Sequence, residues 1–144
     1  MVKYCDYLKT STKCPFCDDN QRHILDKPSA FLTYSLAPYK KDHLLICPKR
    51  HIESFFDLNI QEIEDIGSLE KLGMKILNKL GHISINILFR EGDNIGKSVK
   101  HIHYHLIPNI SLNSESSMPS RRILTKKEIN NLIRKIKKTL KVFR

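Results

Sequence analysis

The chain has 144 residues, 40% of them hydrophobic and 28% charged, a composition that excludes a disordered chain and fits one domain with a single core. Lys and Arg outnumber Asp and Glu by 25 to 15; the resulting net charge of +10 favours polyanionic partners, although it also simply keeps a small protein in solution. No apolar run reaches the roughly 20 residues that cross a bilayer, and residues 1–6 lack the apolar stretch of a signal peptide, so we expect a cytoplasmic protein without membrane contact.

Two of the four cysteines, Cys14 and Cys17, form the motif Cys-Pro-Phe-Cys within a predicted turn at residues 14–20. In a reducing compartment this spacing indicates metal binding or redox chemistry. The redox interpretation is weaker, because the strand-then-helix setting of such motifs is missing. Cys5 and Cys47 are expected to be ordinary small apolar residues.

A predicted β-hairpin follows the cysteine motif. Residues 30–36 are rich in β-formers, and a second apolar run at 43–47 is closed by Pro48. Residues 38–42 between them, beginning with Pro38, supply the connection.

A long amphipathic helix is predicted next. Residues 59–62 have the form of a capping box, Asn-Ile-Gln-Glu, and apolar residues recur behind them at helical spacing until Gly81. Gly67 and Gly73 are the weak points of this helix.

The second half of the chain alternates strands, loops and one more helix. Residues 83–89 and 100–107 are predicted strands separated by a glycine-containing loop at 91–96, and residues 112–120 form a Ser- and Asn-rich loop. A second capping box, Thr125 to Glu128, opens a helix with one apolar stripe and a lysine-rich face. The segment 121–144 contains ten Lys or Arg residues and one acidic residue, so much of the positive charge lies there.

Three histidines alternate within the last predicted strand: His101, His103 and His105. Side chains at alternate positions of a strand share one face. Burying three imidazoles would require a partner for every ring nitrogen. Chance histidines on an exposed face and metal binding by all three are the alternatives to a catalytic role.

The motif His101-x-His103-x-His105, followed by two apolar residues, resembles the signature of the histidine triad (HIT) family. Upstream, residues 96–99 (Gly-Lys-Ser-Val) stand at the family's spacing, and residues 43–51 resemble its other segment, a strand ending in Pro-Lys-x-His. Pro38 also stands where the family has a proline. The resemblance covers residues 14–108.

The resemblance implies a HIT-like α+β fold, with an antiparallel sheet of about five strands and a long helix packed on one face. The basic helix at 121–144 would be added to the 14–108 core within a single domain of residues 1–144. It also implies a homodimer, since small chains enlarge their core by pairing.

The resemblance further implies a nucleotidyl hydrolase or transferase in which His103 attacks the α-phosphorus of a small-molecule nucleotide. A neutral imidazole is a good nucleophile near pH 7, and the nucleotidyl-histidine intermediate is a good leaving group. His105 resembles the third triad histidine, which bonds in the phosphate region. Dinucleoside polyphosphates and nucleoside phosphoramidates are the candidate substrates.

Residues that resemble the family's nucleotide contacts include Ser98, a phosphate-binding hydroxyl, and Gly96, which lets backbone approach an anion. Lys97 stands where many members have Gln, and would either stabilise a polyphosphate leaving group or point to water. Ser35 replaces an acidic residue that many members use for the ribose. Arg90 replaces an Asn and would reach a distal phosphate.

Some branches of the family, and the related galactose-1-phosphate uridylyltransferases, bind zinc through a Cys-x-x-Cys pair and two histidines. The matching residues here are Cys14, Cys17, His51 and His101, which form a closed Cys₂His₂ set for a structural Zn²⁺. A metal-free pair of buried thiols is the alternative. His43 matches a recurring family position, with packing as plausible as ligand contact, whereas His23 and His82 are expected at the surface.

Two non-enzymatic interpretations compete with the hydrolase. One is a nucleotide- or RNA-binding protein that uses the basic C-terminal helix, but only Phe143 offers an interleaved aromatic ring there, so nucleic acid is not the favoured partner. The other is a zinc-stabilised dimeric scaffold without turnover.

Overall fold

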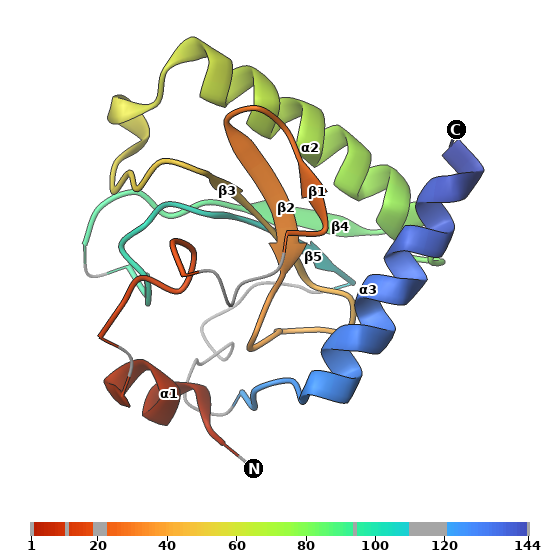
Figure 1. Cartoon of the computed structure of the whole chain (residues 1–144), viewed down its shortest axis with the longest axis horizontal. Helices are drawn as coiled ribbons and strands as arrows, with labels where there is room; N and C mark the ends of the chain where they lie inside the picture. The colour runs from red at the N-terminus through yellow and green to blue at the C-terminus, as the bar shows by residue number, and fades with distance from the viewer. Residues whose placement is uncertain (1, 11, 19–22, 94, 110–120, 144) are drawn as a thin grey trace.

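A computed structural model describes residues 2–143 except 11, 19–22, 94 and 110–120 (Figure 1). Five strands form one antiparallel sheet in the order β1-β2-β3-β5-β4. This agrees with the predicted α+β architecture. In the part of the chain that the structure describes, no helix is long and apolar enough to span a membrane.

The strands are short and centred on the predicted β-hairpin. The hairpin pairs β2 (Ala30–Tyr34) with β3 (Leu44–Pro48), and the two-residue β1 (Leu25–Asp26) extends it on the other side of β2. On the far side, β5 (Tyr104–Pro108) pairs with β3 and β4 (Ile85–Leu88) forms the edge.

The strand predicted for residues 100–107 begins only at Tyr104, so His101 and His103 precede it, although the rings of His103 and His105 still line one pocket. Only His105 lies in the strand. The ladder with β3 ends at the pair Ile46–Tyr104, because the preceding residues turn to another partner: the backbone N–H of Ile102 donates to the carbonyl oxygen of Ile52 at 2.8 Å.

Both predicted capping boxes are present and start the two long helices. The side chain of Asn59 accepts a hydrogen bond from the backbone of Glu62, whose carboxylate accepts one in return, and α2 (Ile60–Lys79) follows. Thr125 and Glu128 do the same for α3 (Lys126–Leu140). The short α1 (Tyr4–Thr10) and the 3-10 turns Phe55–Asp57 and Lys141–Phe143 carry no strong pattern and were not predicted.

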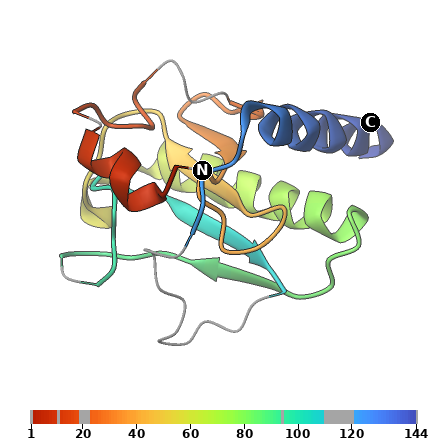
Figure 2. The same cartoon turned by 90° about the horizontal axis from the view of Figure 1, so that it is seen from below.

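The sheet has two different faces. One packs against α2 and α3 in the main core, which contains Leu32, Leu44, Ile46, Leu106, Ile76 and Ile136 among others. The opposite face bears a smaller cluster, formed by Phe16, Phe31, Leu45, Cys47 and Val99 with Leu8 of α1 against it. Figure 1 shows α2 and α1 on opposite sides of the sheet, and Figure 2 shows the same arrangement from below.

The two glycines of α2 occupy opposite environments. A Cβ at Gly73 would clash with Cδ1 of the fully buried Leu106, whereas nothing lies within 4 Å of one at the exposed Gly67. We expect Gly67→Ala to raise the free energy of unfolding by about 0.5–1 kcal/mol through helix propensity. Gly73→Ala should lower it by about 1–2 kcal/mol, since overpacking outweighs the same gain. Urea denaturation measures both, and destabilisation by Gly67→Ala would contradict this account.

The N-terminal segment and the residues before α3 lie side by side. Lys3 and Arg122 form a β-bridge, and the backbone N–H of Tyr4 donates to the carbonyl of Arg121 at 3.4 Å. This contact brings α1 next to a segment more than 110 residues away. The loop predicted at 112–120 lies outside the described residues.

Candidate active site

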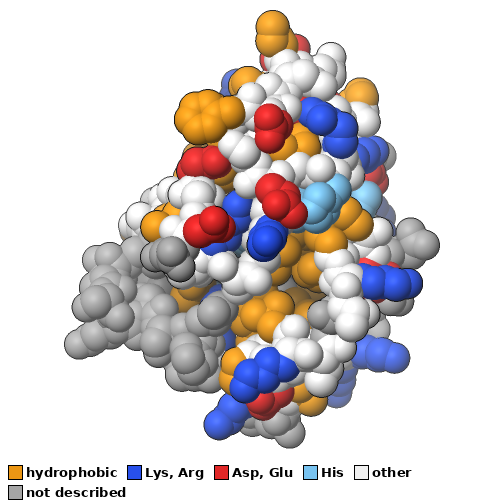
Figure 3. Space-filling view, turned by 90° about the vertical axis from the view of Figure 1, so that its left-hand side faces the viewer, with side chains coloured by type: hydrophobic (Ala, Val, Ile, Leu, Met, Phe, Trp, Pro, Cys, Tyr) orange, Lys and Arg blue, Asp and Glu red, His pale blue; other side chains and the backbone are white. Residues whose placement is uncertain are grey.

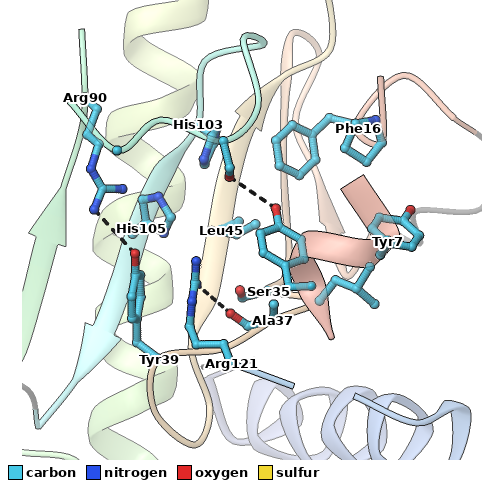
Figure 4. A pocket seen from close by; sticks show the side chains of 15 residues that line it. Tyr7, Phe16, Ser35, Ala37, Tyr39, Leu45, Arg90, His103, His105 and Arg121 are labelled. Carbon is cyan, nitrogen blue, oxygen red and sulfur yellow. Dashed lines mark hydrogen bonds between the residues drawn. The ribbon is translucent and has the colours of Figure 1, made fainter. Parts of the chain in front are cut away.

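A pocket lies on the sheet face opposite α2, and we call it the triad pocket (Figure 4). Six predicted site residues line it: Ser35, Arg90, Gly96, Ser98, His103 and His105. The lining residues that sequence analysis missed as site residues are mainly aromatic or basic: Tyr4, Tyr7, Phe16, Tyr39 and Arg121. Phe16 alone stood inside a motif; the others gave no signal in the sequence.

His103 is held in one tautomer by the backbone. Its Nδ1 lies 2.8 Å from the carbonyl oxygen of His101, which can only accept, so Nδ1 carries the proton and Nε2 carries a free lone pair. Burial lowers the pKa of His103 to about 4, which keeps the ring neutral near pH 7. A neutral imidazole with an available lone pair is a nucleophile.

His105 is oriented through a chain of two hydrogen bonds. The backbone N–H of Tyr39 donates to Nδ1 of His43 at 3.1 Å, so the proton of His43 lies on Nε2 and is donated to Nδ1 of His105 at 2.9 Å. His105 therefore carries its own proton on Nε2, as a donor. Burial lowers the pKa of His43 to about 3 and that of His105 well below its usual range. His43 is buried, as the packing interpretation predicts, and it also lies behind His105 and fixes its tautomer.

Ser98 and Gly96 also line the pocket. The hydroxyl groups of Ser98 and Tyr4 share a hydrogen bond at 3.3 Å. Gly96 has φ of 79°, a conformation that side chains disfavour, and a Cβ there would come 3.8 Å from Nε of Arg90. Ser35 is buried, and its backbone N–H donates to the carbonyl of His43 at 3.0 Å.

Lys97 is not among the residues that line the triad pocket. Its ammonium group donates to the carbonyl oxygen of Glu53 at 3.1 Å. The position predicted for a phosphate contact is thus tied to the loop after β3. Figure 3 shows the side of the molecule that bears the N-terminal and central loops, where acidic and basic side chains are interspersed.

His82, expected at the surface, is instead partly buried. Its Nε2 lies 2.7 Å from Oδ2 of Asp42, which also accepts from Lys135 of α3 at 2.8 Å. His23 is exposed as predicted and stacks on Phe31. The ion pairs of Asp42 with His82 and Lys135 lower the pKa of the Asp42 carboxyl group despite its burial. The ion pair with Lys135 also ties α3 to the turn before β3.

The predicted metal ligands form a second site, which we call the Cys–His cluster: Cys14, Cys17, His51 and His101. Their four ligand atoms lie within 4.8 Å of one another. Nδ1 of His101 is 3.4 Å from Sγ of both cysteines, and Nδ1 of His51 is 3.3 Å from Sγ of Cys17. Two thiols and two imidazoles within this radius could bind a metal ion.

The outer nitrogens of both histidines have acceptors, as metal-binding histidines require. Nε2 of His101 donates to the carbonyl oxygen of Pro48 at 2.9 Å, and Nε2 of His51 lies 3.2 Å from a carboxylate oxygen of Glu53. Both Nδ1 lone pairs therefore face the thiols. Burial, followed by the hydrogen bond with Cys14, raises the pKa of Cys17 to about 11, and a bound cation would reverse this by favouring thiolates.

The Cys–His cluster lies directly beside the triad pocket. The ring of His101 belongs to the cluster, while its carbonyl oxygen fixes the tautomer of His103. Phe16, between the two cysteines, contacts the rings of both histidines, with centroids 5.7 Å from His101 and 5.0 Å from His103. The cysteine turn is thus also a wall of the pocket.

Comparison with protein families and curated proteins gives one consistent result. The family model described as the HIT domain matches residues 18–111. The chain is 27% identical over 95 residues to the bifunctional bis(5'-adenosyl)-triphosphatase/adenylylsulfatase of Arabidopsis thaliana, covering 65% of this chain and 53% of that protein. It is 34% identical over 79 residues to the adenosine 5'-monophosphoramidase of Schizosaccharomyces pombe, covering 55% and 56%. The chain therefore spans little more than half the length of these two relatives.

Solved structures share the fold at low sequence identity. A histidine triad nucleotide-binding protein from Sulfolobus tokodaii superposes with a TM-score of 0.75 at 19% identity, covering 90% of this chain and 93% of that one. A zinc-bound histidine triad family protein from Mycobacterium smegmatis gives 0.63 at 19% identity, covering 95% and 99%.

Proposed function

The chain belongs to the HIT domain family, and from this premise we propose that it is a hydrolase or transferase that cleaves a nucleotide at its α-phosphate. The observation that carries this proposal is the hydrogen bond from Nδ1 of His103 to the carbonyl of His101, which leaves Nε2 as a nucleophile. The candidate substrates are dinucleoside polyphosphates and nucleoside phosphoramidates. The printed functions of the Arabidopsis and yeast relatives support these two classes.

The proposed reaction has two displacements. The lone pair of His103 Nε2 attacks the α-phosphorus, a P–N bond forms, and the leaving group departs with the electron pair of the broken P–O or P–N bond. A water or another acceptor then attacks the same phosphorus, loses a proton to solvent, and returns the electron pair to Nε2. Splitting one difficult step into two easier ones is the advantage of the covalent route.

The other pocket residues stabilise charge. His105, with its proton on Nε2, donates to a non-bridging phosphate oxygen, and the hydroxyl of Ser98 can do the same. Arg90 adds a full positive charge on the same side of the pocket. The aromatic rings of Phe16 and Tyr7 suit the base of the nucleotide.

Trapping the intermediate tests the covalent route. When the protein is mixed with diadenosine triphosphate and quenched within the first turnovers, we expect a mass increase of one adenylyl group that peptide mapping places on His103. The same experiment with His103→Ala should give no adduct. An adduct on a different residue, or turnover that proceeds without one under single-turnover conditions, would contradict the proposal.

We also propose that the Cys–His cluster holds a structural Zn²⁺. Two thiolates and two imidazoles form the closed four-ligand set that structural zinc sites use, and the zinc-bound relative of the same fold agrees with it. A Zn²⁺ bound there would cross-link the cysteine turn to His51, in the loop after β3, and to His101. The same cross-link would hold Phe16 and His101 in place beside His103, the proposed nucleophile.

The homodimer and the single domain over residues 1–144 are also proposals. The mass of the protein in solution, measured by light scattering, tests the first, and a single cooperative unfolding transition tests the second. A monomeric mass at micromolar concentration would contradict the dimer.

A further inference from the structure

Arg121 lies outside residues 18–111, the segment that the family model matches, and still lines the triad pocket. It arrives there because residues 121–123 run beside the N-terminal segment. Its guanidinium carbon lies 3.8 Å from the ring centroid of Tyr39 and 5.3 Å from that of Tyr4. Two aromatic rings thus hold a charged group in the wall of the pocket.

The hydrogen bonding of Arg121 is incomplete. One terminal nitrogen, Nη1, donates to the carbonyl oxygen of Ala37 at 2.7 Å, whereas Nε is buried and has no partner among the described residues. An unpaired buried N–H of a charged group costs free energy. The guanidinium group therefore retains hydrogen-bond donor capacity that no described residue uses.

Among the described residues, no carboxylate compensates the charge of Arg121. No acidic side chain is among the residues that line the pocket, and none of the ion pairs found in the described chain involves Arg121. Burial lowers the pKa of its guanidinium group, and the positive charge of Arg90 acts in the same direction. Two guanidinium groups that repel each other, with no carboxylate between them, make a site for an anion.

Tyr39 connects the two arginines. Its hydroxyl accepts a hydrogen bond from Nη2 of Arg90 at 3.5 Å, and its ring stacks under Arg121. Figure 4 shows Arg90, Tyr39 and Arg121 on one side of the pocket, with Phe16 and Tyr7 on the other. The pocket therefore has a cationic side for phosphates and an aromatic side for a base.

We infer that Arg121, together with Arg90, binds a phosphate group beyond the one that His103 attacks, so that the pocket selects polyphosphate substrates over substrates with a single phosphate. This inference rests on the proposed function. Arg121, and not Lys97 as the sequence suggested, is then the cation that binds the additional phosphate of a polyphosphate. A nucleoside phosphoramidate has one phosphate and an amine leaving group, and would leave Arg121 unpaired.

The first test compares two substrates. Arg121→Gln should lower kcat/KM for diadenosine triphosphate by about 10- to 100-fold, the usual effect of losing charge-assisted hydrogen bonds. The kcat/KM for adenosine 5'-phosphoramidate should change by less than about threefold. Arg121→Lys keeps the positive charge but lacks the planar guanidinium group. Its kcat/KM for diadenosine triphosphate alone should lie between those of wild type and Arg121→Gln.

The matched control is Arg134→Gln, which removes the same charge from the exposed surface of α3. It should leave both rate constants unchanged. Thermal melting of all three variants checks the fold, and the Lys variant keeps the test informative if Arg121→Gln melts early. Equal losses for the two substrates in Arg121→Gln, or no loss for either, would overturn the inference.

The second test does not depend on turnover. Isothermal titration with inorganic triphosphate, at about 0.15 M salt so that distant charges are screened, should show binding to wild type and Arg134→Gln and at least tenfold weaker binding to Arg121→Gln. Absence of binding to wild type, or equal binding by all three proteins, would overturn the inference. If binding of triphosphate depends on Arg121 but neither nucleotide is cleaved, the phosphate-binding role of Arg121 holds and the proposed function fails.

Discussion

Replacing His103 with alanine is expected to lower kcat for release of nucleoside monophosphate by on the order of 10⁴-fold or more, because the substitution removes the group that we propose forms the covalent intermediate. Binding should survive, since Arg90, Ser98 and His105 remain. The measurement is chromatographic release of adenosine monophosphate from both candidate substrates, combined with nucleotide binding by calorimetry. His23→Ala is the matched control, because His23 is exposed and lies outside both sites.

Loss of both nucleotide binding and turnover in His103→Ala would not support a nucleophilic role for His103, because a collapsed pocket would give the same result. We therefore expect His103→Ala to melt within a few degrees of wild type and to bind adenosine monophosphate within about threefold. A variant that folds, binds and still turns over at more than about one hundredth of the wild-type rate would show that another group attacks the phosphorus.

Replacing Cys14 with serine is expected to release the metal from the Cys–His cluster and to lower the free energy of unfolding by about 3–5 kcal/mol, since metal binding contributes directly to folding. For a chain of this size that loss corresponds to a fall in Tm of about 10 °C or more. Elemental analysis of the protein, purified without chelator, should give close to one zinc per chain for wild type. Differential scanning calorimetry measures the change in stability.

Cys5→Ser serves as the control for this experiment, since Cys5 belongs to α1 and is not part of the cluster. It should retain zinc and keep the wild-type Tm within about 2 °C. A wild-type protein that contains no zinc, or a Cys14→Ser variant that retains it in full, would contradict the proposal. The thiols would then be an ordinary metal-free pair.

The elements that the sequence predicted correctly have local causes. The start of α2 depends on Asn59 and Glu62, three residues apart, and its length on apolar spacing within one helix. The β2–β3 hairpin depends on two apolar runs and the short segment between them. Such patterns can be read from neighbouring residues because the contacts that enforce them join neighbouring residues.

The elements that the sequence did not predict depend on contacts between distant residues. The late start of β5 comes from the hydrogen bond between Ile102 and Ile52, and the place of Lys97 from the carbonyl of Glu53. Arg121 enters the pocket because Lys3 pairs with Arg122. No spacing rule connects such residues, so a resemblance over 14–108 could identify the histidines together with Ser35, Arg90, Gly96 and Ser98, but not Tyr4 and Arg121, which lie outside those residues.

The acceptor that orients His103 is a main-chain atom, and every variant at position 101 keeps it. Alanine scanning therefore cannot detect this hydrogen bond. It would make His103 look independent of residue 101, its direct hydrogen-bond partner. A substitution of His101 removes the imidazole and leaves the carbonyl. Any decrease in turnover rate would therefore report a shift in the position of the backbone at residue 101. Replacement of the 101–102 amide by an ester would weaken the acceptor itself, and it would also remove the hydrogen bond from the N–H of Ile102 to the carbonyl of Ile52.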